Sequence, residues 1–203
     1  MILDKNKLEI QALDNLNEER LENILYKSQS NNSFCVKGCD FSYVYFDHLH
    51  LQECIFEKND FVHCEFVTCD LSNLSFENRS CHDVVFNNCN LVGVNFSNVS
   101  LMNVTFNNCK ISYGNFSDST FKNVIFTDCI LENASFSSVL WKEWYLNTCF
   151  IDGCNLMKTN LKNLNISSCD FNYLILDIIK SKGLIVNEIQ ALTLIKSFGV
   201  VVI

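Results

Sequence analysis

The stretch FNNCNLVGVNFSNVSLMNVTFNNCKISYGNF, residues 86–116, decides the fold because a large apolar residue occupies every fifth position in it. Those positions are Phe86, Leu91, Phe96, Leu101, Phe106, Ile111 and Phe116. An α-helix returns a side chain to the same face about every 3.6 residues, and a strand does so every two residues. A period of five fits neither element, so the stretch predicts a repetitive structure of another kind.

The same period continues without interruption from Phe41 to Leu176, over 28 successive apolar positions. All of them are Phe, Leu or Ile except Cys81 and Trp141. The position two residues earlier is mostly small and apolar, whereas the other three positions are mostly Asn, Ser, Asp, Lys and Thr. Each pentapeptide is therefore expected to point one small and one large side chain inward, and to turn or face water with the rest.

A second period, of 20 residues, lies over the first. It is plainest in a row of cysteines: Cys69, Cys89, Cys109, Cys129, Cys149 and Cys169. Four pentapeptides therefore make one square coil, and like residues stack between coils. At the ~4.8 Å spacing of paired strands, about seven coils would make a rod ~34 Å long. Each coil would pack mainly on its two neighbours.

Segments such as FNNCNL, CDLSNLSF and CNLVGVNF resemble the pentapeptide-repeat family, whose units read roughly A-[DN]-[LF]-x-x. The resemblance extends from Gly38 to about Asp177, with Cys or Val often replacing Ala. It implies an all-β solenoid, a right-handed quadrilateral β-helix, over residues 38–178.

The two ends do not show the repeat. Leucines and an isoleucine at helical spacing within residues 2–28 predict a helix, so residues 1–37 are interpreted as an N-terminal helical cap. Such a cap would cover core and unpaired backbone at the end of the solenoid. In residues 179–203, Asn187 can cap a helix through QALTLIKSF that Gly199 would end.

The segment VNEIQALTLIKSFGVVV also resembles the C-terminus of the quinolone-resistance and microcin-immunity pentapeptide proteins. That resemblance implies a rod-like homodimer joined through this end, and binding to a type II DNA topoisomerase, DNA gyrase or topoisomerase IV, in place of DNA. The alternative is a monomer whose helix only caps the last coil. The dimer contacts we predict are Leu192, Ile195, Phe198 and Val200.

The 12 cysteines are interpreted as core residues. Most occupy the small inward position, where a free thiol behaves as a small apolar side chain. Stacked Cβ atoms ~4.8 Å apart would exceed the ~3.8 Å that a disulfide prefers. His48, His50 and His63 are placed outward by the register, away from the cysteines, so no metal site is predicted. With no phosphate loop and no nucleophile–base pair, we expect no enzyme and no cofactor.

One side of the predicted coil is less regular than the other three. Polar residues enter its small inward row at Asn59, Arg79, Ser119 and Thr159, and Cys81 replaces a larger residue. A guanidinium in that slot must reach solvent or a carboxylate. Two interpretations stay open: a tolerated local defect, or a binding surface that includes Asn59, Arg79, Cys81 and Trp141.

The charge is also uneven. The net charge of −8 makes direct binding to nucleic acid or to an acidic membrane unfavourable. Acidic residues gather in the first coils and are the partner-binding residues we predict: Asp40, Glu57, Asp60, Glu65, Asp70 and Glu77. Apolar residues in outward slots mark a second possible contact: Ile125, Ile130, Leu140, Tyr145 and Phe150.

Two functions are compatible with these features. The first is a DNA mimic that binds a type II topoisomerase and confers drug or toxin resistance. The second is a general protein–protein interaction scaffold, since a fold does not fix a function. The N-terminal segment MILDKNKLEIQ lacks a long apolar run, so a cytoplasmic location is expected.

Overall fold

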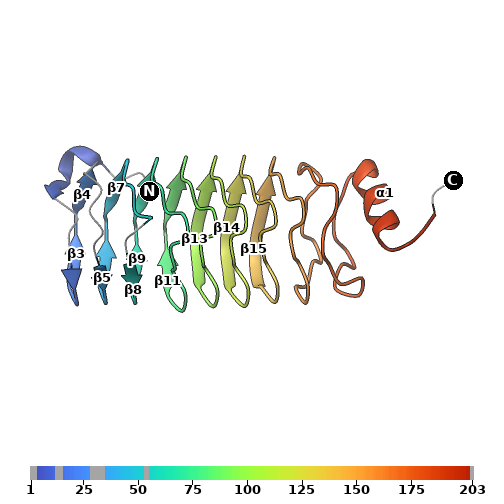
Figure 1. The fold of residues 1–203 in the computed structure, drawn as a ribbon, viewed down its shortest axis with the longest axis horizontal. Coiled ribbons are helices and arrows are strands. Elements are labelled where there is room, and N and C mark those ends of the chain that lie inside the picture. Colours follow the sequence, from blue (N-terminus) through green and yellow to red (C-terminus); the bar gives the residue numbers. More distant parts are fainter. Residues whose placement is uncertain (1–3, 12–15, 28–34, 53–54, 202–203) are drawn as a thin grey trace.

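The chain winds into one elongated parallel β-solenoid, with short strands at one end and a helix at the other (Figure 1). The computed structural model describes residues 4–11, 16–27, 35–52 and 55–201. One sheet has 12 strands and the other has three, and every pair of neighbouring strands is parallel. The predicted all-β solenoid is therefore confirmed.

The strands are short because the chain turns a corner every few residues, and β13 to β15 are longer because each continues through a corner. Their bounds are β1 Glu9–Gln11, β2 Leu16–Asn17, β3 Arg20–Glu22, β4 Ile24–Lys27, β5 Cys35–Lys37, β6 Asp40–Ser42, β7 Tyr45–Asp47, β8 Ile55–Glu57, β9 Asp60–Val62, β10 Glu65–Val67, β11 Ser80–His82, β12 Val85–Asn87, β13 Ser100–Asn107, β14 Thr120–Thr127 and β15 Leu140–Asn147.

The register between coils is the predicted 20 residues. Phe66 pairs with Phe86, Phe86 with Phe106, and Phe106 with Phe126. Isolated bridges such as Asn95 to Asn115 keep the same offset on a side that has no named strand. Like residues therefore stack from coil to coil.

The core is built from rows of phenylalanine rings. Phe86 and Phe106 stack with ring centroids 4.9 Å apart and planes 4° apart, and Phe96 and Phe116 stack at 5.2 Å. Between the rows the rings meet edge to face, as Phe96 does with Phe106 at 78°. Both are favoured ring geometries. The two rows therefore fill the interior and leave the phenylalanines almost fully buried.

Asparagines are abundant because they form the corners. The residue two positions after many of the large inward residues has a positive φ, for example 54° at Asn88, 53° at Asn103 and 49° at Asn108. Asn tolerates this left-handed conformation better than most residues with a side chain. The amide of Asn108 also donates to the side-chain oxygen of Asn88 at 2.8 Å, so successive corners are joined.

The predicted N-terminal helical cap is wrong. The described part of residues 1–37 contains one short 3-10 helix, Lys5–Lys7, and the strands β1 to β5. Leu21 pairs with Phe41 and Leu25 with Tyr45, so the solenoid begins before residue 38. Only the first rung differs, since Glu9 pairs with Ile24 at an offset of 15 residues. Part of the predicted helix, including Leu13, lies outside the described residues.

The predicted C-terminal helix is confirmed as α1, Glu188–Ser197. Asn187 accepts a hydrogen bond from the Gln190 backbone N–H, and the Gln190 side chain accepts one from the Asn187 N–H, each at 2.9 Å. This capping box satisfies two N–H groups at the start of the helix. Gly199, with φ 80°, follows the helix end. A bridge from Asn165 to Ile185 extends the solenoid beyond residue 178.

Candidate partner-binding surface

The first two predicted acidic residues lie side by side on one side of the solenoid. Asp40 in β6 pairs with Asp60 in β9, and the Asp40 side chain is exposed. Asp60 Oδ1 accepts hydrogen bonds from the Ser80 backbone N–H at 2.9 Å and from the Ser80 hydroxyl at 3.0 Å. These two bonds hold the half-buried Asp60 carboxylate in one orientation, which lowers the entropy that a partner would have to remove.

Asp70 is the most firmly held of the predicted acids. Its carboxylate accepts hydrogen bonds from the side chains of Gln52 at 2.5 Å, Ser72 at 2.8 Å and Asn90 at 3.1 Å. Partial burial raises the pKa of Asp70, but these bonds together outweigh burial and hold the pKa below its ordinary value. The carboxylate is therefore fully ionised at neutral pH.

The remaining predicted acids do not join one patch. Glu65 Oε1 accepts from the Asn87 amide at 2.9 Å in the neighbouring row of strands, and Glu77 is exposed near a corner. The Glu57 backbone pairs with Lys37, and its side chain lies outside the described part of the chain. Asp40 and Asp60 stack, whereas the others surround the coil, so the negative charge forms a band and not a spot.

The polar residues of the irregular side perform a structural task. Asn59 Oδ1 accepts from the Cys39 backbone N–H at 2.8 Å, and its amide donates to the Val36 carbonyl at 3.0 Å. The hydroxyls of Ser119 and Thr159 make the same two contacts one coil back, each donating to a carbonyl at 2.6 Å. A buried backbone group without a partner is costly, so these residues are not simple fillers.

Arg79 and Cys81 are the irregular pair in this row. Arg79 is half-buried, and its Nε has no hydrogen-bond partner among the described residues. Cys81 is buried and pairs with Phe61 and Leu101. An orphaned guanidinium nitrogen next to an undersized residue agrees with both earlier interpretations, so the binding role of this pair stays a prediction.

Two tryptophans interrupt the rows on a later coil. Trp141 occupies a large inward position yet stays half-exposed, and its Nε1–H donates to the Asn160 carbonyl at 2.6 Å. The reason is Trp144, which fills a small inward slot and packs against Phe121 at 5.4 Å and Phe136 at 5.1 Å. Sequence reasoning missed Trp144, although a tryptophan in a slot for valine was a visible signal.

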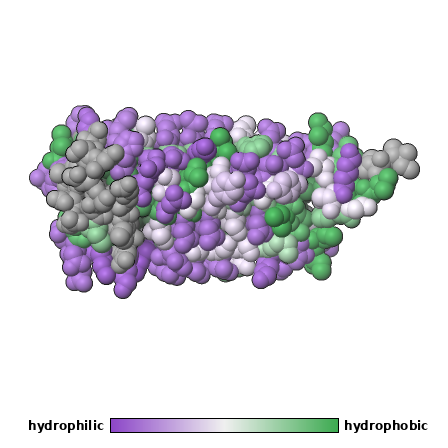
Figure 2. Space-filling model, viewed as in Figure 1, coloured by the Kyte–Doolittle hydropathy of each residue, from purple (hydrophilic) through white to green (hydrophobic). Residues whose placement is uncertain are grey.

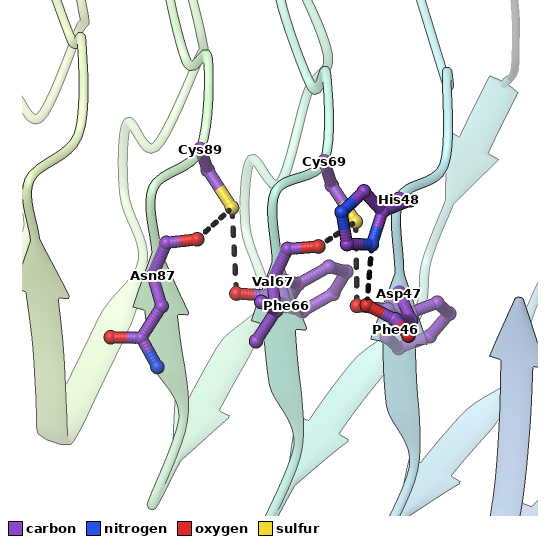
Figure 3. Close-up of polar contacts among 8 residues, drawn as sticks. All are labelled: Phe46, Asp47, His48, Phe66, Val67, Cys69, Asn87 and Cys89. Atoms are coloured by element: carbon purple, nitrogen blue, oxygen red, sulfur yellow. Dashed lines mark hydrogen bonds and ion pairs between the residues drawn. The ribbon is translucent and has the colours of Figure 1, made fainter. Parts of the chain in front are cut away.

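The described cysteines are free thiols, and all but Cys35 are buried. Figure 3 shows how two of them lie: Cys69 donates to the carbonyls of Phe46 and Val67, and Cys89 to those of Phe66 and Asn87, each at 3.4 Å. His48 points away from them and contacts Asp47 at 2.7 Å. No group of His, Cys, Asp and Glu among the described residues could hold a metal ion.

Apolar side chains are exposed toward the C-terminal end of the rod (Figure 2). Of the predicted contact residues, Ile125 is half-buried, and the exposed ones are Ile130, Leu140, Tyr145 and Phe150. The predicted dimer residues are also exposed: Leu192, Ile195, Phe198 and Val200. Ile195 and Phe198 border an apolar cleft of about 190 Å³ between α1 and the last coil. A surface of this kind is available to a second chain.

The comparisons agree with this architecture. A family profile described as "Pentapeptide repeat region" matches residues 79–156, and one described as "Pentapeptide repeats (8 copies)" matches residues 37–77. Together they match more than half of the chain. Among curated proteins, none matches the chain in sequence. Within the described residues, no helix has the length and apolar character needed to cross a membrane.

Two solved structures are similar to the chain. Full-length QnrB1, a plasmid-mediated fluoroquinolone resistance protein, is 20% identical, with a TM-score of 0.48 over 95% of this chain and 100% of QnrB1. HetL is a pentapeptide repeat protein involved in heterocyst differentiation regulation, from the cyanobacterium Nostoc sp. strain PCC 7120. It is 13% identical, with a TM-score of 0.31 over 79% of this chain and 86% of HetL.

Proposed function

Because the chain belongs to the pentapeptide-repeat family, and its repeats build a rigid scaffold, we propose that it is a non-enzymatic binding protein. Its partner would be a type II DNA topoisomerase, DNA gyrase or topoisomerase IV, which it would occupy in place of DNA. It would act in the cytoplasm, where it would protect the enzyme from a drug or toxin. A homodimer joined through α1 would present two acidic ends.

The observation that carries the proposal is the band of carboxylates on the first coils. Asp60, Glu65 and Asp70 are fixed by hydrogen bonds, and they are joined by the exposed Asp40 and Glu77. A groove that binds DNA is positively charged, so it attracts an anionic rod. Because the carboxylates are already ordered, little conformational entropy is lost on binding. The C-terminal segment, which resembles that of the resistance and immunity proteins, supports the same partner.

The test is supercoiling by gyrase and decatenation by topoisomerase IV in the presence of the chain, with and without a cleavage-stabilising drug. We expect inhibition or protection that weakens as salt is raised, because exposed charges are screened. The triple variant Glu57→Gln, Asp60→Asn and Glu77→Gln should lose the effect. It keeps side-chain oxygens that can accept hydrogen bonds, so folding should be preserved.

The matched control removes three charges from later coils: Asp118→Asn, Glu132→Gln and Asp170→Asn. It should behave as the unmodified chain does. No effect on either enzyme at tens of micromolar would rule out the topoisomerase and leave the general interaction scaffold. An equal loss in both triple variants would mean that total charge, and not the acidic band, is responsible.

A further inference from the structure

A groove lined by lysines lies on the irregular side, at the coils that follow the tryptophans. It has a volume of about 550 Å³, and the charged side chains around it are Lys142, Lys158, Lys162, Lys180 and Glu143. Lys142 belongs to β15, far along the rod from the acidic strands β6 and β9 (Figure 1). The groove therefore reverses the sign of the surface within one molecule of net charge −8.

These lysines are not neutralised within the chain. In the part of the chain that the structure describes, none of the four ammonium groups forms an ion pair with a carboxylate. Lys142 also pairs directly with Lys122 on the preceding coil. Like charges opposite each other on neighbouring strands are unfavourable. An anion placed in the groove would relieve that repulsion.

The lining of the groove also includes apolar surface. Leu140 is 70% exposed and occupies an outward slot that holds Thr120 one coil earlier. Trp141 is half-exposed, and its N–H is already bonded to the Asn160 carbonyl. What the indole can still offer a ligand is therefore mainly its apolar ring. Cations around an apolar surface suit a ligand that carries both carboxylates and an apolar side chain.

We propose that this groove binds an acidic peptide segment of a partner protein, with an apolar side chain of the segment over Leu140 and Trp141. A long polyanion such as DNA would be repelled by the acidic remainder of the rod, whereas a short segment experiences only the groove. Lysines are compact point charges, which suit separate carboxylates, and no arginine lines the groove among the described residues. The groove and the acidic band can act independently.

The probe is a fluorescein-labelled synthetic peptide in which glutamates flank one central phenylalanine, and binding is followed by anisotropy. We expect saturable binding that salt weakens. It should also change the tryptophan emission, since both tryptophans of the chain lie in this coil. The variant Lys142→Gln, Lys162→Gln should lower the affinity about tenfold.

The matched control is Lys110→Gln, Lys122→Gln, which removes the same charge outside the groove and should alter the affinity less than about twofold. Three outcomes would overturn the proposal: no binding at millimolar peptide, an equal loss in the control variant, or equal binding of a peptide with glutamines for glutamates. Tighter binding of polyphosphate or single-stranded DNA would assign the lysines to another polyanion. Because topoisomerase is absent, failure here is distinct from failure of the proposed function.

Discussion

The small inward slot of each pentapeptide selects both size and hydrogen-bonding ability. Ser119 donates to the carbonyl of Phe96, which lies 23 residues back, at 2.6 Å. Cys109 donates to the carbonyl of Phe86, at the same separation, at 3.4 Å. A thiol is a weak donor and behaves largely as an apolar group. Cysteine therefore fills the slot without introducing a strongly polar atom, which explains its frequency better than redox chemistry does.

Burial of these side chains predicts a loss of stability at alkaline pH. Burial raises the pKa of Cys64 from 9.0 to about 12, and that of Tyr26 from 10.0 to about 12. Both groups ionise more easily when the chain is unfolded. Their contribution is therefore complete below pH 9 and is lost as the pH rises toward 12. Each such group lowers the free energy of unfolding by up to about 1.4 kcal/mol per pH unit in that window.

The measurement is urea unfolding between pH 7 and pH 11, compared with the variant Cys64→Val. Valine occupies the equivalent slots at Val44 and Val84, so the variant should fold. Its stability should fall less steeply above pH 9. Identical slopes for the two proteins would show that Cys64 does not titrate on unfolding.

At the scale of the element, a row of rings is the unit of stability. Phe96 is fully buried, stacks on Phe76 and Phe116, and meets Phe86 and Phe106 edge to face. Phe96→Ala should therefore lower the free energy of unfolding by ~3–5 kcal/mol, because it leaves a cavity in a closely packed row.

Denaturant unfolding of Phe96→Ala beside Phe150→Ala measures this cost. Phe150 is an outward, exposed phenylalanine, and its truncation should change stability by less than about 0.5 kcal/mol. Similar losses for the two variants would contradict the assignment of inward and outward slots.

Much of the fold could be predicted because a period of five is incompatible with other regular elements. The N-terminal strands could not, because Leu21, Ile24 and Leu25 fit the spacing of a helix as well as the corners of a coil. The lysine groove was missed for a different reason. Lys142, Lys158 and Lys180 come together only when separate coils stack, and total counts of charge hide that arrangement. The acidic residues were placed in the right coils, but around the rod instead of on one side.

At the scale of the molecule, the exposed end predicts a two-fold dimer. Leu192 and Val200 are about half exposed, at 47% and 52%, beside the cleft that Phe198 borders. Light scattering at micromolar concentration should give twice the chain mass of 23.3 kDa. The variant Leu192→Asp, Phe198→Asp should give one chain mass, because two buried charges without partners would oppose association.

The control for the dimer is Ile130→Asp, an exposed apolar position on the rod. It should leave the mass doubled. A full chain that scatters as a single copy would mean that α1 only closes the last coil, through the hydrogen bonds that Gln190 donates to the carbonyls of Ile166 and Cys169.

The constant offset of 20 residues makes the coil an interchangeable part. Removing residues 87–106 would bring Phe86 next to Phe126 through the intervening turn of chain, and like would still stack on like. Gain or loss of whole coils can therefore change the length of the rod in steps of ~4.8 Å while the packing stays the same. The chain acts as a ruler, and the number of coils sets the distance between its acidic band and its lysine groove.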